Sequence, residues 1–169
     1  GIECAGAAHD GPCVPRSLSL MRAVIVGSGS DIAKNLVTNE ALSRIMDTND
    51  AWIRERSGIE TRYYIDPGQS TSDLAVAAAQ RALDHAGVAP SEIDLVVSAT
   101  MTPDHFFPGN GGLIQTRLEI PPVPCFDIRQ QCSGFIYAMG LVDAYVRTGM
   151  AKTALIVGAE VHSGFMPWK

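Results

Sequence analysis

The sequence lacks the features that mark membrane, nucleic-acid-binding or disulfide-stabilised proteins. Only 18% of its 169 residues are charged, the net charge is −5, and no basic run or basic–aromatic cluster occurs, which argues against a nucleic-acid surface. No stretch approaches the ~18 consecutive apolar residues of a transmembrane helix. Four cysteines, in a chain without a signal-peptide pattern, do not make a disulfide framework. We therefore expect a globular, cytoplasmic protein without a membrane span.

The first 20 residues differ from the rest. Residues 1–20 show neither helical nor strand periodicity, so we interpret them as an N-terminal extension, either upstream sequence or a cloning remnant. A short metal or redox element is the alternative, because Cys4, His9 and Cys13 lie close together. Their spacing fits no common zinc pattern, and we predict no metal site. The whole sequence has an apolar content of 46%, and residues 21–169 are sufficient for one domain with a sizeable core.

A glycine pair after the first apolar run resembles part of a dinucleotide-binding fingerprint. Gly27 and Gly29 have the G-x-G spacing, but Ile32 occupies the third glycine position and no helix opens directly after them. Since the glycines of that fingerprint serve a tight turn that leads into a helix, the pattern predicts no dinucleotide cofactor here.

Apolar strands alternate with helical segments along the chain, which predicts an α/β layered fold. The expected strands are residues 22–27, 93–99, 125–128 and 153–159, and the expected helices are 38–46, 47–57, 70–86, 111–118 and 133–147. Ser70 and Asp73 have the spacing of a capping box. The helix over 133–147 is apolar on nearly all sides, which predicts that it is buried in the interior.

Cys132 stands at the start of that apolar helix, after a short apolar-to-polar run and before Ser133 and Gly134. At a helix N-terminus, unpaired N–H groups and the helix dipole stabilise a thiolate, which is the nucleophilic form of cysteine. The alternative is a cysteine that acts as a small hydrophobic core residue. Position alone leaves both interpretations open.

Four segments in one order resemble the ketoacyl-synthase III branch of the thiolase superfamily. They are DTNDAWIRERSGI (47–59), SATMTPDHFFP (98–108), DIRQQCSGFIYAM (127–139) and ALIVGAE (154–160). The resemblance extends from about residue 21 to residue 169. It implies the thiolase-like layered fold (αβαβα), of which this chain would hold only the N-terminal half.

The resemblance implies an acyltransferase that starts fatty-acid or polyketide synthesis. Cys132 would attack an acyl-CoA primer to form an acyl-cysteine, and malonyl carrier protein would then condense with it by losing carbon dioxide. No cofactor is implied beyond the two substrates, acyl-CoA and malonyl-ACP. The family's second half supplies a catalytic histidine and asparagine. His85, His105 and His162 lie outside that histidine motif, so we expect a chain truncated before both residues.

The resemblance also assigns binding residues. Trp52 and Arg56 match the positions that stack on the adenine of CoA, although a core tryptophan and a solvated arginine are the alternative. Phe107 matches a residue that reaches across a homodimer to shape the partner's acyl pocket, and its alternative is an ordinary core phenylalanine. His105 lies in the same loop, near the expected acyl tunnel. Residues 161–164 are neutral where the family has a basic residue, which puts one contact with CoA or the acyl carrier protein in doubt.

Two further functions remain open. The chain could be an inactive or structural fragment that only folds or dimerises. It could also be a thiol-based acyl-binding or redox module, which would need a second cysteine near Cys132. Cys125, on the preceding strand, is a poor candidate for that role.

Overall fold

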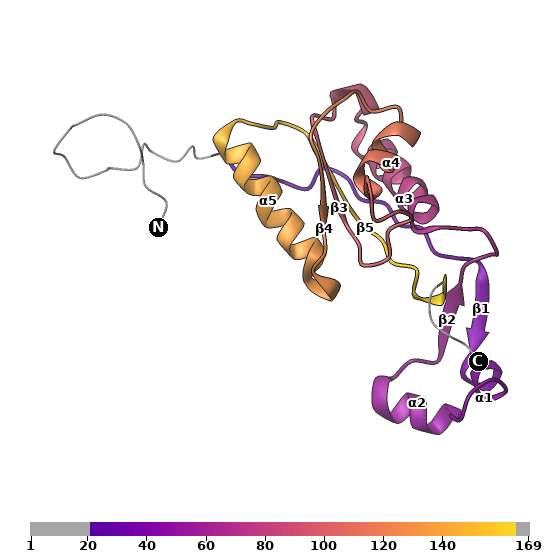
Figure 1. Cartoon of the computed structure of the whole chain (residues 1–169). Helices are drawn as coiled ribbons and strands as arrows, with labels where there is room; N and C mark the ends of the chain where they lie inside the picture. The colour runs from indigo at the N-terminus through magenta and orange to yellow at the C-terminus, as the bar shows by residue number, and fades with distance from the viewer. Residues whose placement is uncertain (1–20, 165–169) are drawn as a thin grey trace.

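A parallel three-stranded sheet forms the centre of the fold in the computed structural model, which describes residues 21–164 (Figure 1). Its strands are β3 (Leu95–Ala99), β4 (Cys125–Ile128) and β5 (Ala154–Gly158), in the order β4-β3-β5. Ala99 aligns with Ile128 on one side and with Gly158 on the other. The carboxyl ends of all three strands therefore meet at one edge. The predicted strands at 93–99, 125–128 and 153–159 are confirmed, with ends shifted by up to two residues.

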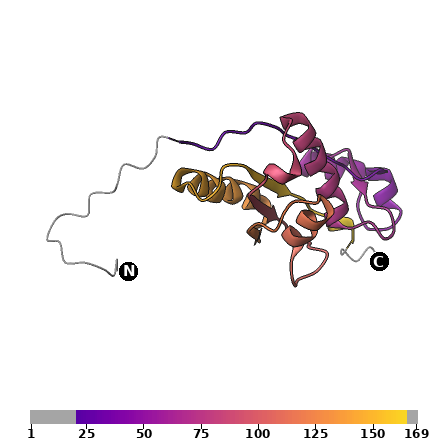
Figure 2. The ribbon, with the colours of Figure 1, turned by 90° about the horizontal axis from the view of Figure 1, so that it is seen from above.

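Helices cover both faces of this sheet. α3 (Thr71–Ala86) and α4 (Asn110–Arg117) lie on one face, and α5 (Gly134–Thr148) lies on the other (Figures 1 and 2). Every residue of β3 is buried, as expected for an apolar strand covered on both sides. Val96 packs into the core beneath α3 and α4, whereas Leu95 and Val97 pack into the core beneath α5. The layered α/β prediction is confirmed in this part of the chain.

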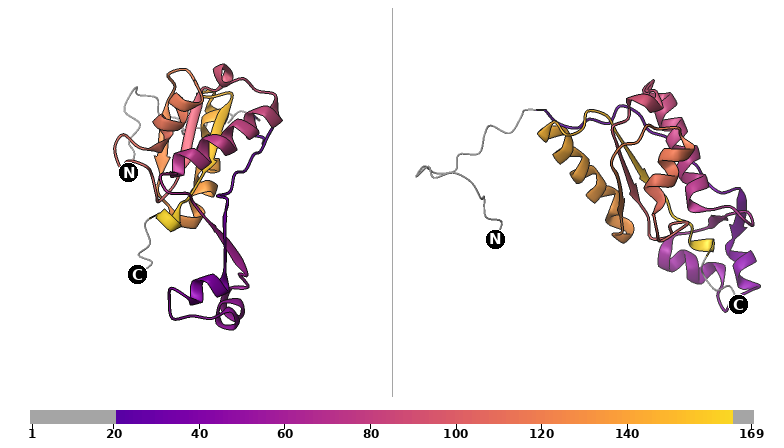
Figure 3. Two further views of the ribbon diagram at one scale, coloured as in Figure 1. Left: turned by 90° about the vertical axis from the view of Figure 1, so that its right-hand side faces the viewer. Right: turned by 45° about the horizontal axis from the view of Figure 1, so that its top comes forward.

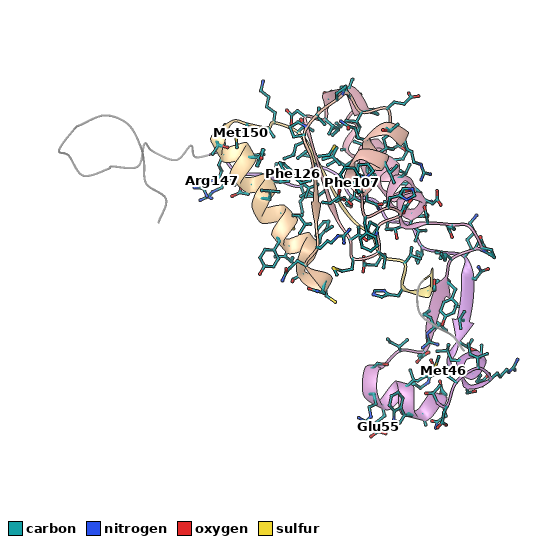
Figure 4. The ribbon with its side chains drawn as sticks, viewed as in Figure 1. Met46, Glu55, Phe107, Phe126, Arg147 and Met150 are labelled. Atoms are coloured by element: carbon teal, nitrogen blue, oxygen red, sulfur yellow. The ribbon has the colours of Figure 1, made fainter. Side chains whose placement is uncertain are left out.

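Local signals explain where the helices begin and end. The Ser70 N–H donates to Asp73 Oδ2 at 2.7 Å, which is half of the predicted capping box. Gly87 ends α3 with a φ of 66°, a left-handed conformation that glycine adopts at little cost. Phe126 of β4 points toward α5, where its ring meets Tyr145 edge-on at 5.7 Å between centroids (Figure 4).

The predicted strand over 22–27 is wrong. Residues 21–33 form no regular element and run from the α5 side of the sheet past α3 toward β1 (Figure 3). Val24 and Ile25 are 75% and 74% exposed. Their sequence favours a strand, but no strand of the described chain lies beside them to complete the hydrogen bonds that a strand needs.

A separate lobe stands beyond the carboxyl edge of the sheet (Figure 1). It contains the antiparallel pair β1 (Asn35–Thr38) and β2 (Thr61–Tyr64), with α1 (Asn39–Ser43) and α2 (Asp50–Ser57) between them. The antiparallel pairing of β1 with β2 was not predicted. The helix expected over 38–46 begins as predicted, since Thr38 caps α1 by accepting from the Ala41 N–H at 3.2 Å, but it ends early, at Ser43.

The prediction that the helix over 133–147 is buried on all sides is also wrong. α5 buries one face, formed by Gly134, Ala138 and Val142 at a spacing of four residues. Ile136 and Tyr137 are 66% and 59% exposed. An amphipathic burial pattern results because the sheet covers only one face of this helix, although its sequence is apolar all round.

Candidate active site

Cys132 lies at the carboxyl edge of the sheet, exposed to solvent. After β4 the chain makes a 3₁₀ turn (Gln131–Ser133), and α5 begins at the next residue. Gln131 has a φ of 40°, which places a non-glycine residue in the left-handed region immediately before the cysteine. Gly134 fixes the approach of the helix, because a Cβ there would lie 3.2 Å from the Ala99 Cβ at the end of β3. The thiol is thereby held where the three strands end.

The start of α5 has no side-chain cap. The Ser133 hydroxyl donates to the Gln130 carbonyl at 3.1 Å and does not accept from the first turn of the helix. The N–H groups of that turn therefore remain able to stabilise a negative charge, such as a thiolate or an oxyanion.

Cys125 differs from Cys132 in its surroundings. Burial, and secondarily the charge of Asp127, raises the pKa of the half-buried Cys125 thiol. A raised pKa leaves less thiolate and so lower reactivity. Of the two described cysteines, the exposed Cys132 is the better placed to act as a nucleophile.

Glu160 joins the loops that follow β3 and β5. Its Oε1 accepts from the Thr100 hydroxyl at 2.6 Å, and from the N–H groups of Met101 and Thr102 at 2.5 and 3.2 Å. The Thr102 hydroxyl accepts in turn from the Val161 N–H at 2.9 Å. Glu160 therefore holds the loop that leads to His105 and Phe107. Sequence reasoning assigned it no role, and its place directly after a buried strand was the available signal.

Asp104 fixes the next part of that loop. Its carboxylate accepts from the Ser72 N–H at 2.9 Å and from the Ser72 hydroxyl at 2.5 Å. Burial alone would raise the pKa of Asp104, but the hydrogen bonds from Ser72 stabilise the charged carboxylate. These bonds outweigh the effect of burial, so the pKa lies below the ordinary value of 3.8. The loop is thus tied to the start of α3 by a charged group.

The aromatic residues of this loop point outward. Phe106 packs beneath the Arg129 guanidinium, with 4.6 Å between Cζ and the ring centroid, which links this loop to the segment before Cys132. Phe107 is 91% exposed in the same loop (Figure 4), so the interpretation as a core phenylalanine is wrong for the described chain. His105 is also exposed.

Trp52 and Arg56 lie one turn apart on α2, in the lobe. Asn49 caps this helix by accepting from the Trp52 N–H at 2.8 Å, where the sequence predicted a start at residue 47. The Arg56 Cζ lies 5.4 Å from the Trp52 ring centroid, and the indole is 53% exposed. The interpretation of Trp52 as a core anchor is therefore wrong, because the ring is half accessible and stacked on a cation.

A cleft of about 670 Å³ lies at the carboxyl edge of the sheet. It is lined by the connection from β2 to α3, by the loop after β3 and by the segment after β5. Cys132, Trp52, Arg56 and Phe107 do not line this cleft. Within residues 21–164, no group of three or more His, Cys, Asp or Glu is placed to hold a metal ion. Nor does any helix of that range have the length and apolar character needed to cross a membrane.

Comparisons with known proteins point to one family. Residues 126–169 match the family described as 3-Oxoacyl-[acyl-carrier-protein (ACP)] synthase III. The beta-ketoacyl-[acyl-carrier-protein] synthase III of Rhodospirillum centenum is 47% identical over 148 residues, which are 88% of this chain and 46% of the relative. That of Rhodospirillum rubrum is 49% identical over 145 residues, 85% of this chain and 45% of the relative. The chain thus spans about half the length of the curated relatives it matches.

Solved structures agree. The 3-oxoacyl-[acyl-carrier-protein] synthase III of Aquifex aeolicus superposes with a TM-score of 0.82 at 40% identity, over 86% of this chain and 47% of that one. The priming beta-ketosynthase of the R1128 polyketide pathway gives 0.81 at 33% identity, over 85% and 43%. The fold is therefore the layered α/β arrangement of these thiolase-like enzymes, and the chain belongs to the beta-ketoacyl-[acyl-carrier-protein] synthase III family.

Proposed function

We propose that residues 21–169 form the nucleophile-bearing half-domain of a beta-ketoacyl-ACP synthase III, and that Cys132 accepts the acyl group of an acyl-CoA primer. The observation that supports this most directly is the exposed thiol at the uncapped start of α5. The family membership supports the choice of substrate.

The first half-reaction follows from that geometry. The Cys132 thiolate adds to the thioester carbon, and the tetrahedral oxyanion accepts hydrogen bonds from backbone N–H groups at the start of α5. The bond between that carbon and the CoA sulfur then breaks, and CoA departs as the thiolate, which takes up a proton from solvent. The product is a Cys132 thioester. In the second half-reaction, malonyl-ACP loses carbon dioxide and its carbanion attacks the carbonyl carbon of that thioester. The bond from this carbon to the Cys132 sulfur breaks, which returns the thiolate and releases a beta-ketoacyl-ACP. This step needs hydrogen-bond donors aimed at the malonyl thioester oxygen, which the family's histidine and asparagine provide.

Trp52 and Arg56 support the CoA part of the proposal. A half-exposed indole beside a guanidinium offers a flat apolar surface and a positive charge, which suit an adenine ring and a phosphate. Phe107 supports a homodimer, because an aromatic side chain that is 91% exposed is suited to packing against a second protein surface. His105, exposed in the same loop, would lie near the acyl group.

Intact-protein mass spectrometry tests the proposal. The chain is incubated with a series of short- and medium-chain acyl-CoAs, and we expect one acyl group per chain. The adduct should disappear in Cys132→Ala and persist in the matched Cys125→Ala variant. Absence of an adduct in protein with native circular dichroism, or an adduct that survives Cys132→Ala, would refute the assignment of the nucleophile.

A further inference from the structure

The helix that carries Trp52 and Arg56 has little apolar packing to hold it. α2 contains eight residues, and isolated helices shorter than about 12–15 residues are marginal in water. It lies with α1 at the end of the lobe farthest from the sheet (Figure 1), and neither hydrophobic core of the sheet includes a residue of the lobe. Within the lobe, all of which the structure describes, three residues are buried: Asn39, Leu42 and Ile53. Since only two of them are apolar, polar contacts must contribute much of what fixes α2.

The Asn39 side chain joins both ends of α2 to the strand pair. It is 1% exposed, at the junction of β1 and α1. Its Nδ2 donates to Asp50 Oδ1, in the first residue of α2, and to the Ile59 carbonyl, just after the helix ends, both at 2.8 Å. Its Oδ1 accepts from Arg62 Nη2 on β2 at 2.6 Å. Both hydrogens of the amide are used, so one buried group connects β1, β2 and the two ends of α2.

Charged neighbours strengthen this connection on one side of the helix. The Asp50 carboxylate also accepts from Arg54 Nε at 2.8 and 2.9 Å, and Arg54 pairs in turn with Glu60. The hydrogen bond from Asn39, followed by that from Arg54, holds the pKa of Asp50 below its ordinary value, so Asp50 is charged at neutral pH. Hydrogen bonds to a charged group are roughly twice as strong as neutral ones. Trp52 lies about 200° around the helix axis from Asp50, so these contacts leave its face open.

We propose that Asn39 is a positioning residue for acyl-CoA: through its contacts with both ends of α2 it presents Trp52 and Arg56 as one preordered surface for the adenosine end of CoA. This inference rests on the proposed function, in which those two side chains bind CoA. Preordering matters because side chains that become ordered only on binding reduce the affinity. Loss of the Asn39 contacts should therefore weaken binding of the adenosine end and leave the chemistry at Cys132 unchanged.

The rate at which Cys132 is acylated separates positioning from chemistry. Intact-protein mass spectrometry follows that rate for two acyl donors. One is the acyl-CoA that labels the chain fastest in the series above, and the other is the pantetheine thioester of the same acyl group, which lacks the adenosine and its phosphates. The second donor cannot use a surface that binds adenine, so a change confined to the first donor reports on that surface alone.

Asn39→Asp is the informative variant, because it retains the shape of the side chain and the acceptor for Arg62 but replaces its donor with an oxygen that faces Asp50. We expect the acyl-CoA concentration at half-maximal rate to rise by about 5- to 150-fold, the cost of ordering two side chains on binding. The maximal rate with acyl-CoA and the rate with the pantetheine thioester should stay unchanged, since neither the thiol nor the start of α5 is altered.

Asn35→Asp is the matched control. Asn35 also lies on β1 and donates to an aspartate, Asp66 Oδ1, at 2.8 Å, but that hydrogen bond does not involve α2, so all rates should equal those of the unsubstituted chain. A second variant, Asp50→Ala, breaks the Asn39 contact from the surface of α2, where the Asp50 side chain is 45% exposed. It should reproduce the Asn39→Asp result, and it decides the question alone if circular dichroism shows that Asn39→Asp does not fold.

The outcomes separate this inference from the proposed function. An unchanged half-saturating concentration of acyl-CoA in the folded variant would overturn the inference and leave the proposed function intact. An equal loss with both donors would assign Asn39 a purely structural role and would also overturn it. If neither donor acylates the unsubstituted chain, the proposed function itself is refuted and the inference falls with it.

Discussion

We expect the addition of a single methyl group to lower the free energy of unfolding most at Gly109. It lies directly before α4 with a φ of 107°, in a region that side-chain-bearing residues rarely adopt. A Cβ there would lie 2.0 Å from Asp127 Oδ2. The other oxygen of that carboxylate accepts from the Asn110 and Gly111 N–H groups at 3.0 and 3.1 Å, which attaches the start of α4 to the end of β4. Gly109→Ala should therefore strain the backbone and displace the carboxylate at once.

The expected cost combines these two effects. An unfavourable backbone conformation costs about 1–3 kcal/mol, and the loss of hydrogen bonds to a charged group costs about 1.5–3 kcal/mol, so the free energy of unfolding should fall by about 2.5–6 kcal/mol. Because domains are stable by only about 5–15 kcal/mol, much of that stability would be lost.

Urea unfolding followed by circular dichroism measures the difference, with Gly112→Ala as the control. Gly112 lies in the interior of α4, and a Cβ there meets no atom within 4 Å, so alanine should stabilise the chain by up to about 1 kcal/mol. A Gly109→Ala midpoint within experimental error of the unsubstituted chain would refute the reasoning.

Three further predictions concern pH, ligand binding and association. Hydrogen bonds from Ser70 lower the pKa of Asp73, and those from Ser72 lower the pKa of Asp104. Both carboxylates therefore add stability above pH 3.8, and this stability is lost as the pH falls through their lowered pKa values. A urea midpoint that stays constant from about pH 6 to about pH 3 would contradict this prediction. Trp52→Ala should weaken acyl-CoA binding by about 5- to 150-fold in isothermal titration, the equivalent of about 1–3 kcal/mol of stacking, and an unchanged Kd would exclude stacking. The exposed apolar side of α5 should make the chain associate as its concentration rises. Ile136→Lys should reduce this association, as measured by analytical ultracentrifugation. An unsubstituted chain that sediments as a monomer at all concentrations would disprove the predicted association.

Sequence patterns predicted the elements whose signals are local. The Ser70–Asp73 spacing and the apolar run of β3 each specify their own structure, and the start of α3 and the strand β3 are both confirmed. The segment at 22–27 has the same kind of local signal, but a strand also needs a neighbour, and no pattern within six residues shows whether one is present. The same reason explains α5, whose apolar composition cannot show which of its sides the described chain covers.

The site was predictable to a similar extent. The position of Cys132 at the start of a helix followed from the sequence, because the strand, the turn and the helix are consecutive. The Glu160 hydrogen bonds to Thr100 and Met101 did not, since they join residues about 60 positions apart whose proximity depends on the register of β3 and β5.

The division of β3 between two cores has a consequence for motion at the nucleophile. The core on the α3 and α4 side contains ten buried residues, whereas the core beneath α5 contains five. Local opening begins at the elements that are held by the fewest buried apolar contacts. We therefore expect α5 to detach from the sheet before α3 or α4 does. Cys132 lies in the 3₁₀ turn directly before this helix, so every such opening would carry the thiol away from the ends of the strands. The reactivity of the cysteine should then depend on the fraction of molecules in which α5 is packed against the sheet.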